Sequence, residues 1–165
     1  MQITQTHPTF TAEVSGLDLR QPLTPAEAAE VEAAMDRHGV LIFRGQDVTD
    51  DQQKAFARNF GTLEFATGNI QTNDERRIPF DMADISNLDR DNKLFARDDR
   101  RRMFNLGNLL WHSDSSFKPT PPKFSALSAR AIPSSAGDTQ FADMRAAYDA
   151  PDDATNAELA GLVTH

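Results

Sequence analysis

The sequence contains no cysteine, which excludes disulfide scaffolds, thiolate zinc sites and cysteine nucleophiles. It has no apolar run of about 18 residues, and it does not begin with the basic stretch and apolar core of a secretory leader. We therefore expect no membrane association and a cytoplasmic location. Basic residues are also few, because 17 Lys and Arg stand against 25 Asp and Glu, for a net charge of −8. This balance argues against nucleic acid as a partner, so an anionic ligand needs a local positive pocket, and any metal must bind through N and O ligands.

The 165 residues suffice for one compact domain. The first third predicts the order strand, helix, strand, helix, and it opens with short extended pieces at residues 10–14 and 17–19. Thr24 and Glu27 form a capping box that begins a helix, and Gly39 is placed to end it. Residues 40–43 are a continuous apolar run, which indicates a buried strand with both faces covered. A second capping box, Thr49 with Gln52, begins another helix, in which two phenylalanines stack at i and i+4.

Regular patterns stop between residues 62 and 107, which are polar and charged over most of their length. A long loop inside a compact domain is usually functional, so we expect a mobile lid or entrance here. Strand-like segments return at residues 108–112, 124–129 and 139–142, separated by turns rich in Pro and Gly. Short strands with such turns indicate a sandwich or barrel. Two short helices are expected near the end, around residues 143–149 and from Thr155.

The motif His112-Ser113-Asp114 is the strongest candidate for chemistry. On an extended segment, residues i and i+2 project from the same face, whereas a helix turns them apart. A neutral imidazole and a carboxylate, joined by a second imidazole, form the 2-His-1-carboxylate triad, which leaves one side of an iron ion open. Taken alone, the tripeptide is better explained by a surface ion pair or a capped turn than by a metal site. A hydrolytic zinc site needs three protein ligands, which the sequence does not show.

The surroundings of the motif match a known family. The matching blocks are GVLIFRGQ (39–46), AFARNFG (55–61), ADISN (83–87), LWHSDSSF (110–117) and GDTQFADMRAAY (137–148). In their order and spacing they resemble the taurine and 2,4-dichlorophenoxyacetate dioxygenase family, and its herbicide-degrading branch more closely than its taurine branch. The resemblance covers essentially the full chain.

The resemblance implies an α+β fold, an incomplete double-stranded β-helix (a cupin-like jelly roll) with flanking helices. Residues 1–165 then form the N-terminal part of a single dioxygenase domain, with residues 62–107 as its lid. The family pattern places a distal His ligand and an Arg for 2-oxoglutarate further downstream, in a C-terminal half that these residues do not include. His7, His38 and His165 do not match that distal ligand.

The resemblance also assigns roles to single residues. His112 and Asp114 look like the proximal iron ligands, and Thr139 looks like the hydroxyl that binds 2-oxoglutarate. From the pattern alone, Thr139 is also an ordinary strand threonine. Asn108 shares the predicted strand face of the ligands and resembles a substrate-contacting asparagine. Lys93 resembles a lysine considered for substrate carboxylate binding, although from the pattern alone an exposed loop lysine is the default explanation.

Two further features near the site have plainer explanations. A run of three arginines at residues 100–102 either focuses anions toward the entrance or forms a solvated face, and the second reading is preferred. Trp111 points away from His112 by the alternation rule, so we expect it to pack in the core.

The implied chemistry is hydroxylation of a C–H bond with Fe(II) as cofactor and 2-oxoglutarate and O2 as co-substrates, giving succinate and CO2. The presence of Asp114 favours hydroxylation over halogenation. The expected substrate is a small organic acid such as an aryloxyalkanoate, which hydroxylation beside the ether oxygen would split into a phenol and an oxo acid. One alternative is taurine or another sulfonate, and a second is a truncated fragment without activity. The expected partner is this small anionic substrate, and a homo-oligomer is left open.

Overall fold

The structure is a computed structural model that describes residues 1–65, 76–135 and 137–162. The chain divides into two compact units, each described here by itself. Unit 1 comprises Met1–Phe60 and Leu127–His165, and unit 2 comprises Gly61–Ala126. Residues 66–75 of the predicted lid, as well as His165, lie outside the described residues. No helix in the described ranges is both long and apolar enough to cross a membrane.

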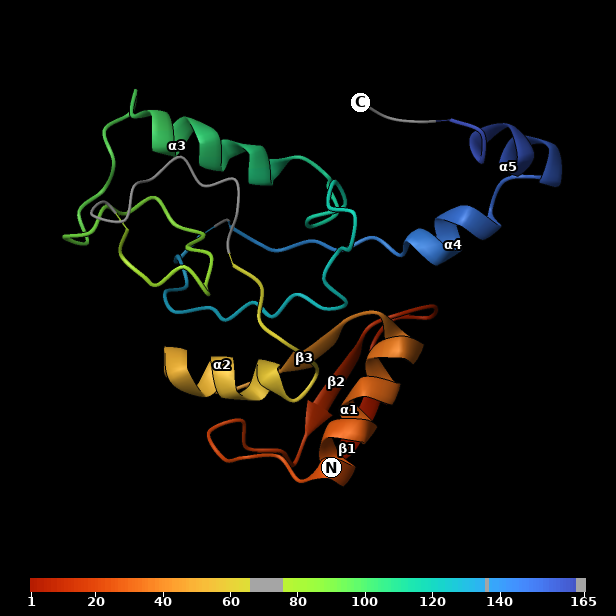
Figure 1. The fold of residues 1–165 in the computed structure, drawn as a ribbon, viewed down its shortest axis with the longest axis horizontal. Helices are drawn as coiled ribbons and strands as arrows, with labels where there is room; N and C mark the ends of the chain where they lie inside the picture. The colour runs from red at the N-terminus through yellow and green to blue at the C-terminus, as the bar shows by residue number, and fades with distance from the viewer. Residues whose placement is uncertain (66–75, 136, 163–165) are drawn as a thin grey trace. The chain divides into compact units, whose positions relative to one another are not determined.

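A three-stranded mixed sheet forms the base of unit 1 (Figure 1). Its strands are β1 (Gln2–Gln5), β2 (Ala12–Ser15) and β3 (Leu41–Phe43), in the order β1-β2-β3. β1 runs antiparallel to β2, with Ile3 opposite Val14, and β2 runs parallel to β3. β1 was not predicted, because its sequence QITQ has one apolar residue and its order comes from pairing with β2.

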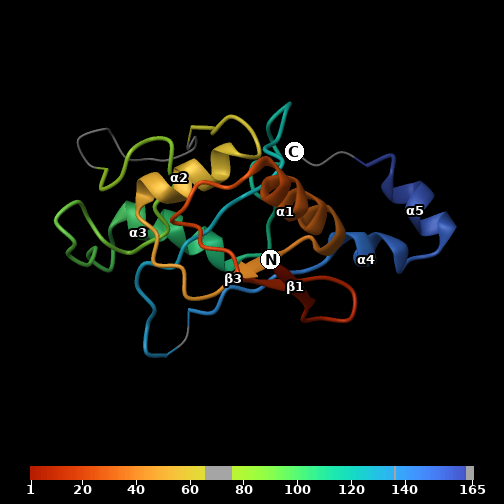
Figure 2. The same cartoon turned by 90° about the horizontal axis from the view of Figure 1, so that it is seen from below.

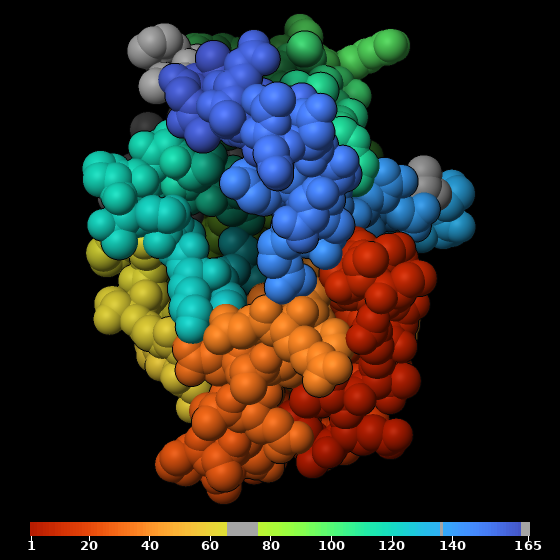
Figure 3. Space-filling model, turned by 90° about the vertical axis from the view of Figure 1, so that its right-hand side faces the viewer, coloured from red at the N-terminus to blue at the C-terminus, as the bar shows by residue number. Residues whose placement is uncertain are grey.

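Helix α1 (Pro25–His38) connects β2 to β3 and lies against the sheet (Figures 1 and 2). Its predicted capping box is confirmed: the Glu27 amide donates to Thr24 Oγ1 at 3.2 Å, and the Thr24 amide donates to Glu27 Oε2 at 2.8 Å. The predicted end is also confirmed, since Gly39 has φ +71° and its amide donates to the Met35 carbonyl. The surfaces of α1 and the first strands adjoin in Figure 3.

The core of unit 1 lies between α1 and the sheet. Its buried residues are Val14, Leu17 and Val31. Partly buried apolar side chains surround them: Met1, Ile3, Leu19, Leu23, Leu41, Phe43, Phe56 and Phe60. The predicted strand at 40–43 is present as β3 but is only half-buried. The expectation that both its faces are covered is therefore wrong for the described structure, because all three residues of β3 stay partly exposed whichever face they point to.

Helix α2 (Asp50–Arg58) also begins with its predicted capping box, in which the Gln52 amide donates to Thr49 Oγ1. The predicted stacking of Phe56 on Phe60 is confirmed, with ring centroids 5.2 Å apart in an edge-to-face arrangement. Phe56 meets Phe43 of β3 in the same way at 5.6 Å. Aromatic pairs of this geometry tie α2 to the sheet.

The later part of unit 1 contains α4 (Met144–Asp149) and α5 (Asp153–Leu159), which follow one another in Figure 2. The helix predicted at 143–149 is confirmed. The second begins before Thr155, because Asp152 is its N-cap and accepts from the Thr155 amide at 2.8 Å. Arg145 Nη1 also donates to the carbonyl of Asp36 in the last turn of α1, at 2.9 Å.

Unit 2 contains the helix α3 (Arg100–Asn105), continued by a 3-10 helix at Leu106–Leu109. The expectation that residues 62–107 lack regular structure is wrong for α3, since Asp99 caps a turn that the charge pattern did not suggest. Much of unit 2 is held by local polar contacts. Arg77 binds Asp84 through two hydrogen bonds of 2.9 and 2.8 Å. The role of 62–107 as a lid stays a prediction.

The strands predicted at residues 108–112, 124–129 and 139–142 are not formed in the described chain. A strand needs a neighbour to hydrogen-bond with, and the described sheet consists of β1, β2 and β3 alone. Trp111 is 69% exposed, so its predicted core role is wrong for this structure, in which no strand layer forms around it. The described fold is thus a small mixed sheet with helices and long irregular segments, and no jelly roll is formed in it.

Candidate metal centre

His112 and Asp114 lie in unit 2, just after the 3-10 helix, and their side chains meet. Leu110 is extended, with φ −90° and ψ 145°, and Ser115 turns the chain with φ +53°. Between these two points the chain is extended at first and enters a turn at Asp114, and the two side chains reach one another across Ser113. Nε2 of His112 lies 3.4 Å from Oδ1 of Asp114. The pair therefore meets without the strand hydrogen bonds that the sequence predicted.

The orientation of the His112 ring is fixed by the backbone. Nδ1 of His112 lies 2.7 Å from the carbonyl oxygen of Leu110. A carbonyl oxygen can only accept, so Nδ1 carries the hydrogen of this bond. In the neutral ring Nε2 then has a free lone pair, and this is the atom that faces Asp114. Metal-binding histidines use this arrangement, with one nitrogen held by a protein acceptor and the other directed at the ion.

The two oxygens of the Asp114 carboxylate have different surroundings. Ser125 Oγ donates to Oδ2 at 2.8 Å, and Oδ1 faces the His112 ring. Ser125 was not singled out from the sequence, where it is an ordinary serine in a segment predicted as a strand. The one signal that could have found it is its place on the next segment of a predicted barrel.

The charges of the pair indicate what could lie between them. With the hydrogen on Nδ1, both Nε2 and Oδ1 present lone pairs to each other, which is unfavourable unless a cation lies between them. Two atoms that each lie about 2.1 Å from a first-row divalent ion in adjacent octahedral positions are about 3.0 Å apart. The 3.4 Å separation is slightly wider than this, so a small rotation of either side chain fits the pair to an ion.

The same two atoms form a simple ion pair if Nε2 is protonated, and this is the competing explanation. Their side chains are 48% and 60% exposed, so solvent would weaken such a pair. The described part of the chain contains no group of three His, Cys, Asp or Glu residues that could hold a metal. His112 and Asp114 are therefore two groups that could bind one ion, and the described residues add no third to them.

The other predicted site residues lie elsewhere in the chain, Asn108 and Lys93 in unit 2 and Thr139 in unit 1. Asn108 lies in the 3-10 helix, and the Leu110 amide donates to the Gly107 carbonyl at 3.0 Å. This turn breaks the alternation, so the prediction that Asn108 shares a strand face with His112 and Asp114 is wrong.

Lys93 and Thr139 lie in irregular segments. The amide of Lys93 donates to Asp89 Oδ1 at 2.9 Å in a tight turn, and its side chain is exposed. Thr139 belongs to unit 1 and is exposed, and the strand predicted to begin there is not formed. Their binding roles stay predictions.

Two of the three arginines at 100–102 make local contacts. Arg101 binds the carboxylate of Asp99 at 2.7 and 3.0 Å, and its guanidinium lies 4.4 Å from the centre of the Phe95 ring. Arg102 donates to the carbonyl of Arg97 at 2.9 Å. The hydrogen bonds from Arg101 lower the pKa of Asp99 to about 2. These contacts favour a structural role for the arginines over the focusing of anions.

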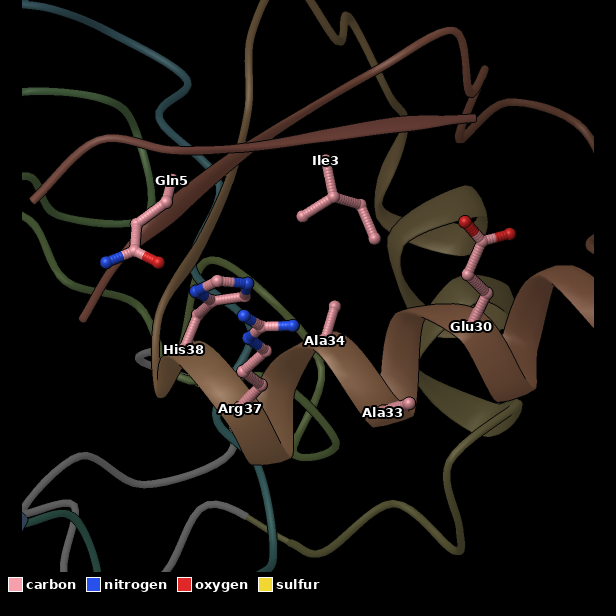
Figure 4. Close-up of a pocket in the computed structure, with 7 residues that line it drawn as sticks. All are labelled: Ile3, Gln5, Glu30, Ala33, Ala34, Arg37 and His38. Carbon is pink, nitrogen blue, oxygen red and sulfur yellow. The ribbon is translucent and has the colours of Figure 1, made fainter. Parts of the chain in front are cut away.

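A separate groove of about 380 Å³ lies between β1 and α1 in unit 1 (Figure 4). Its lining residues are Ile3, Gln5, Glu30, Ala33, Ala34, Arg37 and His38. His38 is 7% exposed, and Figure 4 shows it at one end of the groove with Glu30 at the other. In this groove the imidazole and the carboxylate thus lie apart, unlike those of His112 and Asp114 in unit 2.

Comparison with known proteins places this geometry in context. The family model "Taurine catabolism dioxygenase TauD, TfdA family" matches residues 2–165. An alpha-ketoglutarate-dependent 2,4-dichlorophenoxyacetate dioxygenase of Cupriavidus pinatubonensis is 48% identical over 94% of this chain and 54% of its own length. An (S)-phenoxypropionate/alpha-ketoglutarate-dioxygenase of Delftia acidovorans is 38% identical over 95% of this chain and 51% of its own length.

A solved structure is also similar. It is the crystal structure of AAD-2 in complex with Mn(II) and N-oxalylglycine, with a TM-score of 0.91 and 56% identity over 95% of this chain and 55% of that one. The chain thus spans about half the length of the relatives that it matches.

Proposed function

This chain belongs to the taurine catabolism dioxygenase TauD, TfdA family, and on that premise we propose that it is the N-terminal part of an Fe(II)- and 2-oxoglutarate-dependent dioxygenase. The observation that carries the proposal is the pairing of His112 Nε2 with Asp114 Oδ1, with Nδ1 held by the Leu110 carbonyl. In this proposal the two side chains are the proximal ligands of the iron. Because the chain spans about half of its relatives, activity and substrate are proposed for the whole protein.

The proposal includes a jelly roll completed by a downstream half. Segments 108–112, 124–129 and 139–142 then become strands once partner strands lie beside them. The exposed apolar side chains of this region support the proposal, since large exposed apolar patches usually mark surfaces that another element covers. They include Leu109, Leu110, Trp111, Phe117, Leu127 and Ile132. Residues 62–107 would form the lid of this domain.

The chemistry that Fe(II) supplies is oxidation of a substrate C–H bond by O2, coupled to decarboxylation of 2-oxoglutarate to succinate and CO2. His112 and Asp114 would hold the metal from one side and leave the opposite side for the co-substrates. The Thr139 hydroxyl would donate to the distal carboxylate of 2-oxoglutarate. N-oxalylglycine, which is bound in the similar AAD-2 structure, differs from 2-oxoglutarate by an NH in place of a CH2.

The proposed substrate is an aryloxyalkanoate. The names of the two relatives support this class, since each denotes a dioxygenase of a phenoxyalkanoate. Hydroxylation at the carbon beside the ether oxygen gives a hemiacetal, which breaks down to a phenol and an oxo acid. Lys93 and Asn108 are proposed to contact the substrate on the basis of the family resemblance. Both side chains are exposed, so each is accessible to a substrate.

The test uses the full-length protein with Fe(II), 2-oxoglutarate and a substrate panel. We expect 2,4-dichlorophenoxyacetate or (S)-phenoxypropionate to yield equal amounts of succinate and phenol, whereas taurine yields little product. Preference for taurine would overturn the aryloxyalkanoate assignment. Control reactions with ascorbate and O2 but without substrate measure the succinate that forms without substrate oxidation.

The residues 1–165 alone give a second test, directed at the inactive-fragment alternative. Two ligands should bind Fe(II) weakly, because affinity depends on a complete site. Anaerobic calorimetry should therefore show weak binding to residues 1–165 and tight binding to the full-length protein. Tight 1:1 binding to residues 1–165 would contradict the assignment of a third ligand to a downstream segment.

A further inference from the structure

The hydroxyl of Ser125 donates a hydrogen bond to the Asp114 carboxylate. Ser125 Oγ lies 2.8 Å from Oδ2 of Asp114, within the range of a good O–H to carboxylate bond. Hydrogen bonds to an ionised acceptor are about twice as strong as those between neutral groups. The bond joins two segments of unit 2 that are separated by a proline-rich turn.

The torsion that orients a carboxylate is soft and nearly two-fold, so an unrestrained Asp presents either oxygen, or both, to a ligand. The side chain of Asp114 is 60% exposed, and packing does not fix it. The bond from Ser125 removes this equivalence, because it occupies Oδ2 and leaves Oδ1 facing His112 Nε2.

We propose that Ser125 is a positioning residue that makes Asp114 a single-oxygen metal ligand. This inference rests on the proposed function. A carboxylate that binds through both oxygens takes two of the six octahedral positions, whereas one oxygen takes a single position. With His112 and a second histidine, single-oxygen binding leaves three positions open, and this is the number that a chelating 2-oxo acid and O2 require. Ser125 therefore reserves space at the metal as well as orienting its ligand.

The test compares variants of the full-length protein. Ser125→Ala removes the donor, Ser125→Thr retains a hydroxyl, and Ser86→Ala is the matched control, because Ser86 is a serine of unit 2 whose hydroxyl accepts from the Leu88 amide instead. His112→Ala and Asp114→Ala report on the proposed function itself. Partners of metal ligands typically change affinity by about 10- to 100-fold when they are removed.

The readouts are the anaerobic Mn(II) dissociation constant and the Mn(II) electron paramagnetic resonance spectrum with N-oxalylglycine bound. We expect Ser125→Ala to weaken Mn(II) binding by about tenfold and to change the spectrum, because the coordination of Asp114 changes. Ser125→Thr and Ser86→Ala should match the wild type in both. If Ser125→Ala does not fold, Ser125→Cys replaces it under the same criteria, since a thiol is a weak donor of similar size.

Two results separate failure of this inference from failure of the proposed function. Wild-type affinity and spectrum in Ser125→Ala, together with loss of binding in Asp114→Ala, would overturn the role of Ser125 and leave the metal site standing. Wild-type Mn(II) binding in both His112→Ala and Asp114→Ala would overturn the metal site itself, and the role of Ser125 with it.

Discussion

Arg145 connects the segment at residues 137–148 to the end of helix α1. The variant Arg145→Ala tests whether this contact matters for stability and for ligand binding. Arg145 Nη1 donates to the Asp36 carbonyl at 2.9 Å, and its Nε donates to Asp143 Oδ1 at 3.3 Å. The Asp36 carbonyl lies in the last turn of α1, where a helix presents its terminal carbonyl groups. The guanidinium also lies at the negative end of the α1 dipole. Arg145 thus anchors the segment that contains Thr139 to the end of α1.

The size of the effect follows from these contacts. A hydrogen bond from a charged group contributes about 1.5–3 kcal/mol. The Arg145 side chain is 51% exposed, so solvent screening reduces this to about 1 kcal/mol. A ligand that binds only when the segment is docked loses affinity in proportion to the undocked fraction. We therefore expect the dissociation constant of 2-oxoglutarate to rise by up to about fivefold, which corresponds to 1 kcal/mol.

Two measurements on the full-length protein check this. Urea denaturation should show a loss of about 1 kcal/mol in Arg145→Ala, and anaerobic calorimetry of the Fe(II) form should show the weaker binding of 2-oxoglutarate. Arg145→Lys should give an intermediate result, since one ammonium cannot reach both partners as a guanidinium does. Arg130→Ala is the matched control, because Arg130 binds Asp50 and Gln53 of α2 instead. Unchanged stability and 2-oxoglutarate affinity in Arg145→Ala would refute the reasoning.

Three further predictions concern the framework. Thr24→Ala should destabilise the protein by about 1 kcal/mol through loss of the α1 cap, and Thr24→Ser should restore it in thermal denaturation. Val31→Ala should cost about 2 kcal/mol in urea denaturation, because Val31 is buried between α1 and the sheet and its loss leaves a cavity. The pKa of Asp99 is about 2, below its usual 3.8, so its contribution is present above pH 3.8 and is lost as the pH falls toward 2. Acid titration followed by amide NMR of α3 should show this loss, and Asp99→Asn should abolish it.

The helices of unit 1 were predictable because their signals are local. The capping boxes at Thr24 and Thr49 and the end of α1 at Gly39 depend on residues within a few positions of one another. β1 was missed, and the strands predicted after residue 108 are not formed in the described chain, for the opposite reason. A strand is stabilised by a neighbour that can lie anywhere in the sequence, so β1 forms beside β2 without a strong pattern of its own. The segment 108–112 has a strong pattern, and yet its first residues form a 3-10 helix.

In the candidate site, too, the local features could be predicted from the sequence and the contacts between distant residues could not. The proximity of His112 and Asp114 followed from their i, i+2 spacing, which is a local property. The partners that orient them did not follow from any motif, since Ser125 reaches Asp114 through tertiary structure. The orientation of the His112 ring depends on the carbonyl of Leu110, a backbone contact that leaves no mark in the sequence.

The central claim is that His112 Nε2 and Asp114 Oδ1 hold a metal together. A crystal structure of the full-length protein with Mn(II) and N-oxalylglycine tests it most directly. We predict one metal ion about 2.1 Å from each of these two atoms, with His112 Nδ1 still donating to the Leu110 carbonyl and Ser125 to Asp114 Oδ2. A metal ion bound elsewhere, or one that leaves Asp114 uncoordinated, would contradict the account.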